Sequence, residues 1–197
     1  MVEKAVAFYF DFMSPYSYLA HTQLPDLVAK YGYILEYHPI DIPSAKIAAG
    51  NYGPSNRSIA PKFEALLADL ERWAERYDVP FEFPPNLNCK YWNIGVLYAQ
   101  SANDVKRYVD SAYRIIWGEG QDPERDDHLE RCAEEMSWLP DEFKRYVHGE
   151  QAASSFRKAC VDAHNRGVFG APIMMLDDRI WWGNDRLTFL EEYLQQQ

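Results

Sequence analysis

The sequence predicts an α/β fold in which a small sheet is interrupted by a large, all-helical insertion. Residues 5–38 have a strand–helix–strand pattern, residues 61–165 have mostly helical spacing, and residues 172–194 contain a proline, two strands and a helix. Because both chain ends supply strands, the helical segment is an insertion into one sheet. This order is that of a thioredoxin fold. We predict a thioredoxin-like domain of residues 1–60 and 166–197, and a helical insertion domain of residues 61–165.

The first unit is predicted from a buried strand that runs directly into a helix start. Ala5 to Phe12 (AVAFYFDF) is almost entirely apolar and of strand length, as expected for a central strand. Ser14-Pro15 follows, and serine is a preferred N-cap while proline suits the first helical position. The helix is expected to end at Gly32, before a second strand over Tyr33 to His38. A helix between two strands implies that they pair in parallel.

The middle of the chain is predicted to be a long loop followed by helices. Asp41 to Ala60 contains several Gly, Pro and Asn residues and is expected to be a loop, of a length that is usually functional in a compact domain. The expected helices are residues 61–77, 93–100, 104–117, 127–137, 140–148, 152–165 and 186–194, and the last two strands are residues 173–176 and 179–182. Asp177-Asp178 is expected to turn the hairpin between those strands.

Composition and charge exclude several classes of protein. The 197 residues are 47% hydrophobic and 25% charged, which is ordinary for a globular domain and excludes wholesale disorder. A net charge of −10 argues against nucleic acid and anionic membranes as partners. From the sequence we expect neither a membrane span nor a targeting signal. Cys89, Cys132 and Cys160 are far apart and form no C-x-x-C, so we expect neither a disulfide nor a metal site, and a cytoplasmic location.

Ser14 is the first candidate functional residue. In the predicted topology it lies at the N-terminus of the first helix, where free N–H groups and the helix dipole favour an anion. A redox relative of this fold would carry its reactive cysteine here. A serine cannot form a disulfide, but its hydroxyl can donate a hydrogen bond to the thiolate of a ligand and lower the pKa of that thiol. The alternative is that Ser14 only caps the helix.

Pro172 is the second candidate. It follows Phe169-Gly170-Ala171 and precedes a predicted buried edge strand, which is where thioredoxin folds place a cis-proline. A cis X–Pro bond is a minority state that usually marks a specified turn. The backbone of Ala171 would then be available to pair with an extended peptide. The alternative is an ordinary trans proline at the start of a strand.

Polar residues near the C-terminus and in the long loop complete the predicted site. Asp185 can receive the ammonium of a ligand's amino-acid end, although Asn184 and Asp185 are equally suited to cap a helix. Lys46 and Asn56 are candidate contacts for an anion and an amide, whereas a loop lysine is often only solvated. A thiol ligand with peptide character and an amino-acid end is glutathione. The candidate contacts for a planar, apolar second substrate are Tyr9, Phe12, Trp92, Trp117 and Trp181.

Six motifs together resemble a known family. They are residues 8–20 (FYFDFMSPYSYLA), 46–57 (KIAAGNYGPSNR), 69–74 (DLERWA), 117–120 (WGEG), 168–172 (VFGAP) and 181–187 (WWGNDRL). The chain resembles, over nearly its whole length, the 2-hydroxychromene-2-carboxylate isomerases, which are glutathione-dependent enzymes of bacterial naphthalene catabolism. Kappa-class glutathione transferases belong to the same DsbA-like family and share the Ser-Pro-Tyr start and the proline loop. The WGNDR ending and the GPSNR loop favour the isomerases.

The resemblance implies a reaction and a role for each matched residue. Ser14 is the catalytic residue and holds the thiolate of glutathione. The sulfur adds to the chromene, the ring opens, the adduct rotates, and glutathione leaves to give trans-o-hydroxybenzylidenepyruvate. The implied glutathione-binding residues are Ser14, Ala171, Pro172, Trp182, Gly183, Asn184 and Asp185, and the implied contacts of the aromatic carboxylate substrate are Lys46, Asn56, Leu87 and Asn88. The resemblance also implies a homodimer.

One departure from the family pattern and three alternative functions remain. Cys89-Lys90-Tyr91-Trp92 stands where relatives carry a Ser-Arg-Arg type run, although Lys90 can still supply a positive charge for the substrate carboxylate. A kappa-like glutathione transferase would consume glutathione with an electrophile. A noncatalytic carrier would use the same pocket. A thiol–disulfide oxidoreductase is nearly eliminated by Ser14 and the absence of C-x-x-C.

Overall fold

The sheet of this protein is assembled from both ends of the chain, as the sequence predicts. The computed structural model describes residues 4–197, so residues 1–3 of the predicted first domain lie outside the described residues. The strands found there are β1 (Ala5–Phe10), β2 (Ile34–Pro39), β3 (Ile173–Leu176) and β4 (Arg179–Trp182). Their order is β2-β1-β3-β4, with β1 and β2 parallel and the other neighbours antiparallel. The thioredoxin-like fold is therefore confirmed.

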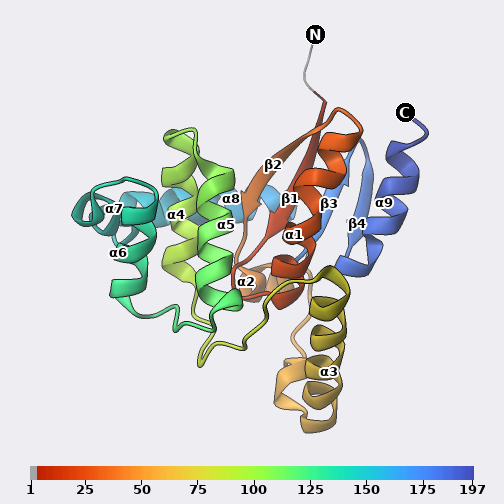
Figure 1. Cartoon of the computed structure of the whole chain (residues 1–197), viewed down its shortest axis with the longest axis horizontal. Helices are drawn as coiled ribbons and strands as arrows, with labels where there is room; N and C mark the ends of the chain where they lie inside the picture. Colours follow the sequence, from red (N-terminus) through yellow and green to blue (C-terminus); the bar gives the residue numbers. More distant parts are fainter. Residues whose placement is uncertain (1–3) are drawn as a thin grey trace.

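Helices surround this sheet and extend to one side of it. The α-helices are α1 (Pro15–Lys30), α2 (Ile42–Ala48), α3 (Ala60–Tyr77), α4 (Lys90–Ser101), α5 (Val105–Tyr113), α6 (Asp126–Glu135), α7 (Pro140–Val147), α8 (Glu150–Asn165) and α9 (Leu187–Leu194), and the shorter turns are η1 (Asn56–Ser58), η2 (Arg114–Gly118) and η3 (Asn184–Arg186). In Figure 1, α1 crosses the front of the sheet and α8 lies behind it. Helices α4 and α5 stand beside β2, α6 and α7 lie farther out on that side, and α3 projects away from the body. The domain bounds given above stay a prediction.

The two faces of β1 explain why this strand is central. Phe8 and Phe10 are fully buried and their rings stack at 5.1 Å between centroids on the side of α1. Ala7 and Tyr9 point to the opposite face, where they pack with Ala163 of α8. Because successive side chains of a strand point to opposite faces, a nearly continuous apolar run is needed only when both faces are covered. The position of β1 between β2 and β3 confirms the predicted central strand.

Two local expectations are wrong. Residues 42–48, expected within a loop, form helix α2, because the carboxylate of Asp41 accepts a hydrogen bond from Ser44 N at 2.8 Å and Pro43 is compatible with a first helical turn. Lys46 therefore lies on a helix. The strand after Pro172 is also not an edge strand, since β3 lies between β1 and β4.

The inserted helices pack through aromatic side chains and one close approach at Gly95. The ring of Phe143 in α7 packs against Tyr98 of α4 at 5.4 Å and against Tyr108 of α5 at 5.8 Å between centroids. Gly95 of α4 lies against two of these rings, and a methyl group added there would overlap the hydroxyl of Tyr108 and approach Phe143 to 2.9 Å. The glycine thus sets how closely the helices approach. No helix of residues 4–197 combines the length and apolar character needed to cross a membrane.

We predict that Gly95→Ala lowers the free energy of unfolding by about 1 to 3 kcal/mol, because the added methyl group forces buried rings apart. Thermal unfolding followed by circular dichroism measures this loss. Gly118→Ala is the matched control, since its added methyl group would have its nearest neighbour at 3.6 Å, an ordinary contact. Equal midpoints for the two variants would contradict the prediction.

Candidate functional site

Ser14 is the N-cap of α1 and follows the turn after β1. The start of α1 lies at the lower end of the sheet in Figure 1. Its side chain caps the helix, because its Oγ accepts a hydrogen bond from Ser17 N at 3.1 Å. Ser14 is 5% exposed, and the first turn of α1 contains no acidic residue that would neutralise the positive end of the helix. The oxygen is used as an acceptor, so the hydroxyl hydrogen remains free for donation to an anion. Capping and thiol binding are therefore compatible roles.

The proline loop and the segment after β4 meet beside this helix start. The Ala171–Pro172 peptide bond is cis, as expected from the sequence. The carbonyl of Pro172 accepts a hydrogen bond from Gly183 N at 3.0 Å, and the rings of Phe169 and Trp182 pack edge to face at 5.0 Å. Ala171 stays half-buried, whereas Pro172 is buried. The structure thus brings together the two segments predicted to bind one ligand.

Asn184 is a buried amide without a hydrogen bond of good geometry. It is 2% exposed, and neither its Oδ1 nor its Nδ2 makes such a bond among the described residues, although the hydroxyl of Tyr77 lies beside it. Such orphaned groups are costly, so an unpartnered buried amide indicates a place for a polar ligand. The preceding Gly183 has a φ of 111°, and a side chain there would meet the carboxylate of Asp185 at 2.6 Å. Only glycine allows this turn.

Asp185 pairs with Arg186 of η3 and lies close to Tyr16 of α1. Its exposed carboxylate forms an ion pair with Arg186 at 2.6 Å. Burial raises the pKa of Tyr16, and the carboxylates of Asp69 and Asp185 raise it further. The Tyr16 hydroxyl donates to Asp69 Oδ2 at 2.7 Å, which ties α1 to α3. Asp185 therefore lies close to the first turn of α1, near Ser14.

A buried carboxylate that the sequence analysis did not assign lies behind Ser14. Asp11 is 1% exposed, and burial raises its pKa to about 6. Its Oδ1 accepts hydrogen bonds from Met13 N at 3.0 Å and Asn93 Nδ2 at 2.7 Å, while its Oδ2 accepts one from Ile42 N at 2.9 Å. The sequence signal for this residue was a single charge inside an otherwise apolar strand-length run.

Arg57 and Cys89 are a second pair that the sequence analysis did not place. Burial lowers the pKa of Arg57 of η1, and the charges of Asp11 and Cys89 act in the opposite direction, so its guanidinium lies toward both groups. Burial raises the pKa of the Cys89 thiol well above its usual range. A buried thiol of this kind is protonated at neutral pH and is a poor nucleophile. We therefore regard Arg57 as a positively charged residue of the site and Cys89 as a buried, unreactive residue beside it.

The predicted substrate contacts are more dispersed. Lys46 lies half-buried on α2, and Asn56 begins η1, where its Oδ1 accepts from Lys62 Nζ at 3.5 Å. Leu87 packs against the core, and the exposed Asn88 donates to Glu124 Oε1 at 2.6 Å. Among residues 4–197 no hydrogen bond joins these predicted contacts to the hydroxyl of Ser14. Their roles stay predictions.

The aromatic residues considered for a planar substrate belong to the core. They are Tyr9 at 2%, Phe12, Trp92 and Trp117 at 0%, and Trp181 at 9% exposure. The indole N–H of Trp117 donates to the carbonyl of Phe12 at 2.7 Å, and that of Trp92 donates to the carbonyl of Pro123 at 2.8 Å. The indole nitrogens of Trp92 and Trp117 are thus satisfied internally, whereas the buried hydroxyl of Tyr9 has no hydrogen-bond partner among the described residues. All five side chains are part of the packed interior.

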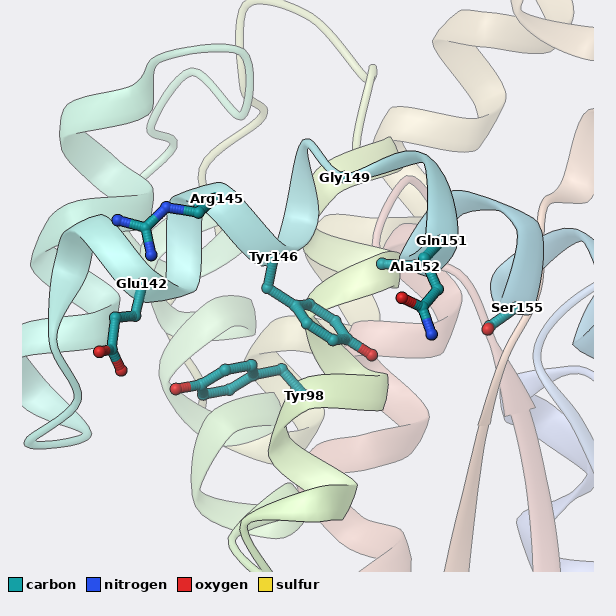
Figure 2. Close-up of a pocket in the computed structure, with 8 residues that line it drawn as sticks. All are labelled: Tyr98, Glu142, Arg145, Tyr146, Gly149, Gln151, Ala152 and Ser155. Atoms are coloured by element: carbon teal, nitrogen blue, oxygen red, sulfur yellow. The ribbon is translucent and has the colours of Figure 1, made fainter.

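Two surface cavities lie apart from the predicted site. The pocket in Figure 2, of about 470 Å³, is formed by α4, α7 and α8, with the rings of Tyr98 and Tyr146 at its centre. A second cavity of about 490 Å³ lies between α2 and α8, and Lys90 is at its edge. Neither contains Ser14, the proline loop or Asn184. Within residues 4–197, no three His, Cys, Asp or Glu side chains gather as a metal site.

Comparison with known proteins identifies the family. Residues 5–195 match the DSBA-like thioredoxin domain. The chain is 51% identical over 191 residues to a 2-hydroxychromene-2-carboxylate isomerase of Sphingobium xenophagum, and the match covers 97% of this chain and 98% of that protein. The chain belongs to the 2-hydroxychromene-2-carboxylate isomerase family. The resemblance predicted from the six motifs is therefore confirmed.

Two further comparisons agree with this family. A solved structure of a 2-hydroxychromene-2-carboxylate isomerase matches with a TM-score of 0.94 at 39% identity, covering 98% of this chain and 95% of that one. A glutathione S-transferase kappa 1 of Caenorhabditis elegans is 23% identical over 97% of this chain and 91% of that protein. The isomerases are thus much closer to this chain than the transferase is, in accordance with the WGNDR and GPSNR motifs.

We predict that Asn184→Ala changes the free energy of unfolding by less than about 1 kcal/mol, because no hydrogen bond is lost. Asn93→Ala is the matched comparison, since Asn93 is equally buried but its amide donates to Asp11 and accepts from Phe12 N at 3.1 Å. That variant leaves the buried Phe12 N without a partner and removes one of the three bonds to the Asp11 carboxylate, so it loses about 3 kcal/mol. Urea unfolding of both variants measures the difference. A larger loss for Asn184→Ala would show that its amide is bonded within the protein.

Proposed function

We propose that this protein is a glutathione-dependent isomerase that interconverts 2-hydroxychromene-2-carboxylate and trans-o-hydroxybenzylidenepyruvate in aromatic catabolism such as naphthalene degradation. The observation that carries the proposal is the free hydroxyl hydrogen of Ser14 at the positive end of α1, beside a cis-proline loop, in a chain 51% identical to an isomerase of that name. Glutathione, when bound, supplies a thiolate that adds to the substrate and leaves unchanged.

The residues beside Ser14 fit a bound tripeptide. The orphaned amide of Asn184 provides a donor and an acceptor for the polar amino-acid end of glutathione, and Asp185 provides a carboxylate for its ammonium. The half-buried backbone of Ala171 is available for the peptide portion. Pro172 shapes this loop, while Trp182 and Gly183 hold the opposite segment against it. Together with Ser14, these are the residues that we propose bind glutathione.

Ser14 acts by stabilising a sulfur anion. Its oxygen is held by Ser17 N–H, which fixes the position from which the hydroxyl donates. A hydrogen bond to the charged form of a thiol, together with the helix dipole, lowers the thiol pKa and increases the thiolate fraction at neutral pH. The two contributions act at the same point, because Ser14 is the N-cap residue itself.

Local cations offset the acidic surface for an anionic substrate. The protein has a net charge of −10, so its overall field repels a carboxylate. Lys46 of α2 and Arg57 of η1 are two cations on segments that lie near Asp11, just before the start of α1. We assign them to the substrate carboxylate and to the negative charge that develops on substrate oxygen during ring opening. Asn56, Leu87 and Asn88 complete the proposed substrate contacts, and a homodimer stays part of the proposal.

A spectrophotometric assay tests the function. The purified protein is expected to convert 2-hydroxychromene-2-carboxylate with substoichiometric glutathione, and the glutathione concentration after the reaction is expected to equal the starting value. Stoichiometric loss of glutathione in the presence of an electrophile would instead identify a kappa-like transferase. Glutathione binding without turnover of either substrate class would identify a carrier. Either result would overturn the isomerase assignment.

We predict that Ser14→Ala lowers kcat at neutral pH by about 100- to 1000-fold, as expected for removal of one donor to a developing anion. The pKa of bound glutathione rises, because its thiolate loses a hydrogen bond. Turnover and the ultraviolet absorbance of the thiolate are measured as functions of pH. Glutathione binding weakens much less than turnover. Ser14→Thr keeps the hydroxyl and the cap and is the control. Unchanged turnover of Ser14→Ala would remove Ser14 from the reaction.

A further inference from the structure

The carboxylate of Asp11 bonds three separate segments at once. It accepts hydrogen bonds from Met13 N in the turn before α1, from Ile42 N at the first residue of α2, and from Asn93 Nδ2 of α4. The network is closed by two more bonds, from Ser14 N to the carbonyl of Asp11 at 2.9 Å and from Phe12 N to Asn93 Oδ1 at 3.1 Å. One fully buried residue thus connects the sheet, the first two helices and the helical insertion.

Each of these segments carries part of the proposed site. Met13 directly precedes Ser14, so its bond to Asp11 fixes the turn that presents the hydroxyl. Helix α2 carries Lys46 one turn after Ile42. Helix α4 follows the segment that contains Leu87 and Asn88. The Asp11 carboxylate is therefore hydrogen-bonded to the segments that carry both the proposed thiol-binding residue and the proposed substrate-binding residues.

We propose that Asp11 is a positioning residue of the isomerisation, whose carboxylate sets the distance between the Ser14 hydroxyl and the substrate-binding residues on and around α2 and α4. The inference rests on the proposed function and adds to it a group that touches neither glutathione nor substrate. Its effect is geometric, because a displacement of about 1 Å in the position of a reacting group can lower a rate by about 100-fold.

The effect of Asp11 on folding stability distinguishes a positioning role from a purely structural one. Burial raises the pKa of Asp11 to about 6, so the folded state binds its proton more tightly than the unfolded chain does. Its contribution to stability is therefore most favourable below about pH 4 and is lost as the pH rises through 6. At neutral pH the ionised carboxylate costs stability although it accepts three hydrogen bonds. We attribute this buried charge to its role in fixing the relative positions of the residues of the site.

Charged and titratable groups of the neighbouring elements lie close enough to Asp11 for charge interactions to affect pKa values within this group, and Asp41 raises the pKa of Asp11. They are Asp41 at the start of α2, Arg57 of η1, Cys89 before α4, Tyr113 of α5 and Cys160 of α8. Arg57 is the cation in this set, and Asp41 is the other carboxylate. Asp41 lies next to the bonded Ile42 but makes its own hydrogen bond to Ser44 N, so it offers a matched control.

The test is Asp11→Asn, which keeps the size of the side chain but replaces one acceptor oxygen by a donor. At least one of the three donors then loses its partner. We expect kcat to fall by about 10- to 100-fold while the Kd of glutathione changes by less than about threefold. The thermal midpoint at pH 8 is expected to stay the same or rise, because a buried charge is removed. A structural role alone would lower the midpoint and kcat together.

Asp41→Asn is the control for the loss of a nearby negative charge. Asparagine caps a helix as well as aspartate does, so α2 is preserved and kcat is expected to stay unchanged. Asn93→Ala is the second variant and removes one of the three bonds. Its expected loss of about 3 kcal/mol is one that a domain of typical stability tolerates. We expect kcat to fall less in Asn93→Ala than in Asp11→Asn. In the double variant, the fold-loss of kcat is expected to be smaller than the product of the two single fold-losses.

Hydrogen exchange gives a readout that does not depend on turnover. At least one of the amides of Met13 and Ile42, which bond to different oxygens of Asp11, is expected to exchange faster in Asp11→Asn than in the wild-type protein, and both are expected to exchange at the wild-type rate in Asp41→Asn. Unchanged exchange in Asp11→Asn, or an unchanged kcat in Asp11→Asn and Asn93→Ala, would overturn the inference. A wild-type protein without isomerase activity would refute the proposed function instead, and the exchange rates would still decide whether Asp11 holds the two segments.

Discussion

The buried hydrogen bonds of Asp11 are the constraint on which the arrangement of the site depends. They join residues that are 31 and 82 positions away along the chain, at Ile42 and Asn93. Packing alone leaves neighbouring helices free to shift by small amounts, whereas directional bonds to one carboxylate fix their relative register. The helical insertion is thereby attached to the thioredoxin-like sheet at the point where the first helix begins.

The sheet brings the two halves of the proposed glutathione site to one edge. Strand β1 ends near Ser14, and β3 begins just after Pro172. These strands are antiparallel, with Tyr9 opposite Ile173, so the end of one lies beside the start of the other. The N-cap of α1 and the proline loop therefore meet although the helical insertion separates them in sequence. Topology, rather than any local motif, produces this juxtaposition.

The parts of the structure that local chemistry determines could be predicted from the sequence. The bounds of β3 and β4 follow from short apolar runs around Asp177-Asp178, and the start of α1 follows from Ser14-Pro15. The features that depend on partners distant in the sequence could not be predicted. The role of Asp11 depends on Asn93, and the direction of Arg57 depends on burial beside Asp11. Helix α2 was missed because its single cap at Asp41 is followed by a Gly- and Pro-rich segment.

The origin of β3 and β4 from the C-terminal part of the chain affects how the protein is made. Once residues 60–165 have left the ribosomal tunnel, a nascent chain can form α1 and much of the inserted helical bundle, but it still lacks the strands that complete the sheet. Asn184 emerges only after both of these strands. During synthesis, the ability to hold a thiol ligand is therefore acquired late, after the helical insertion has been made.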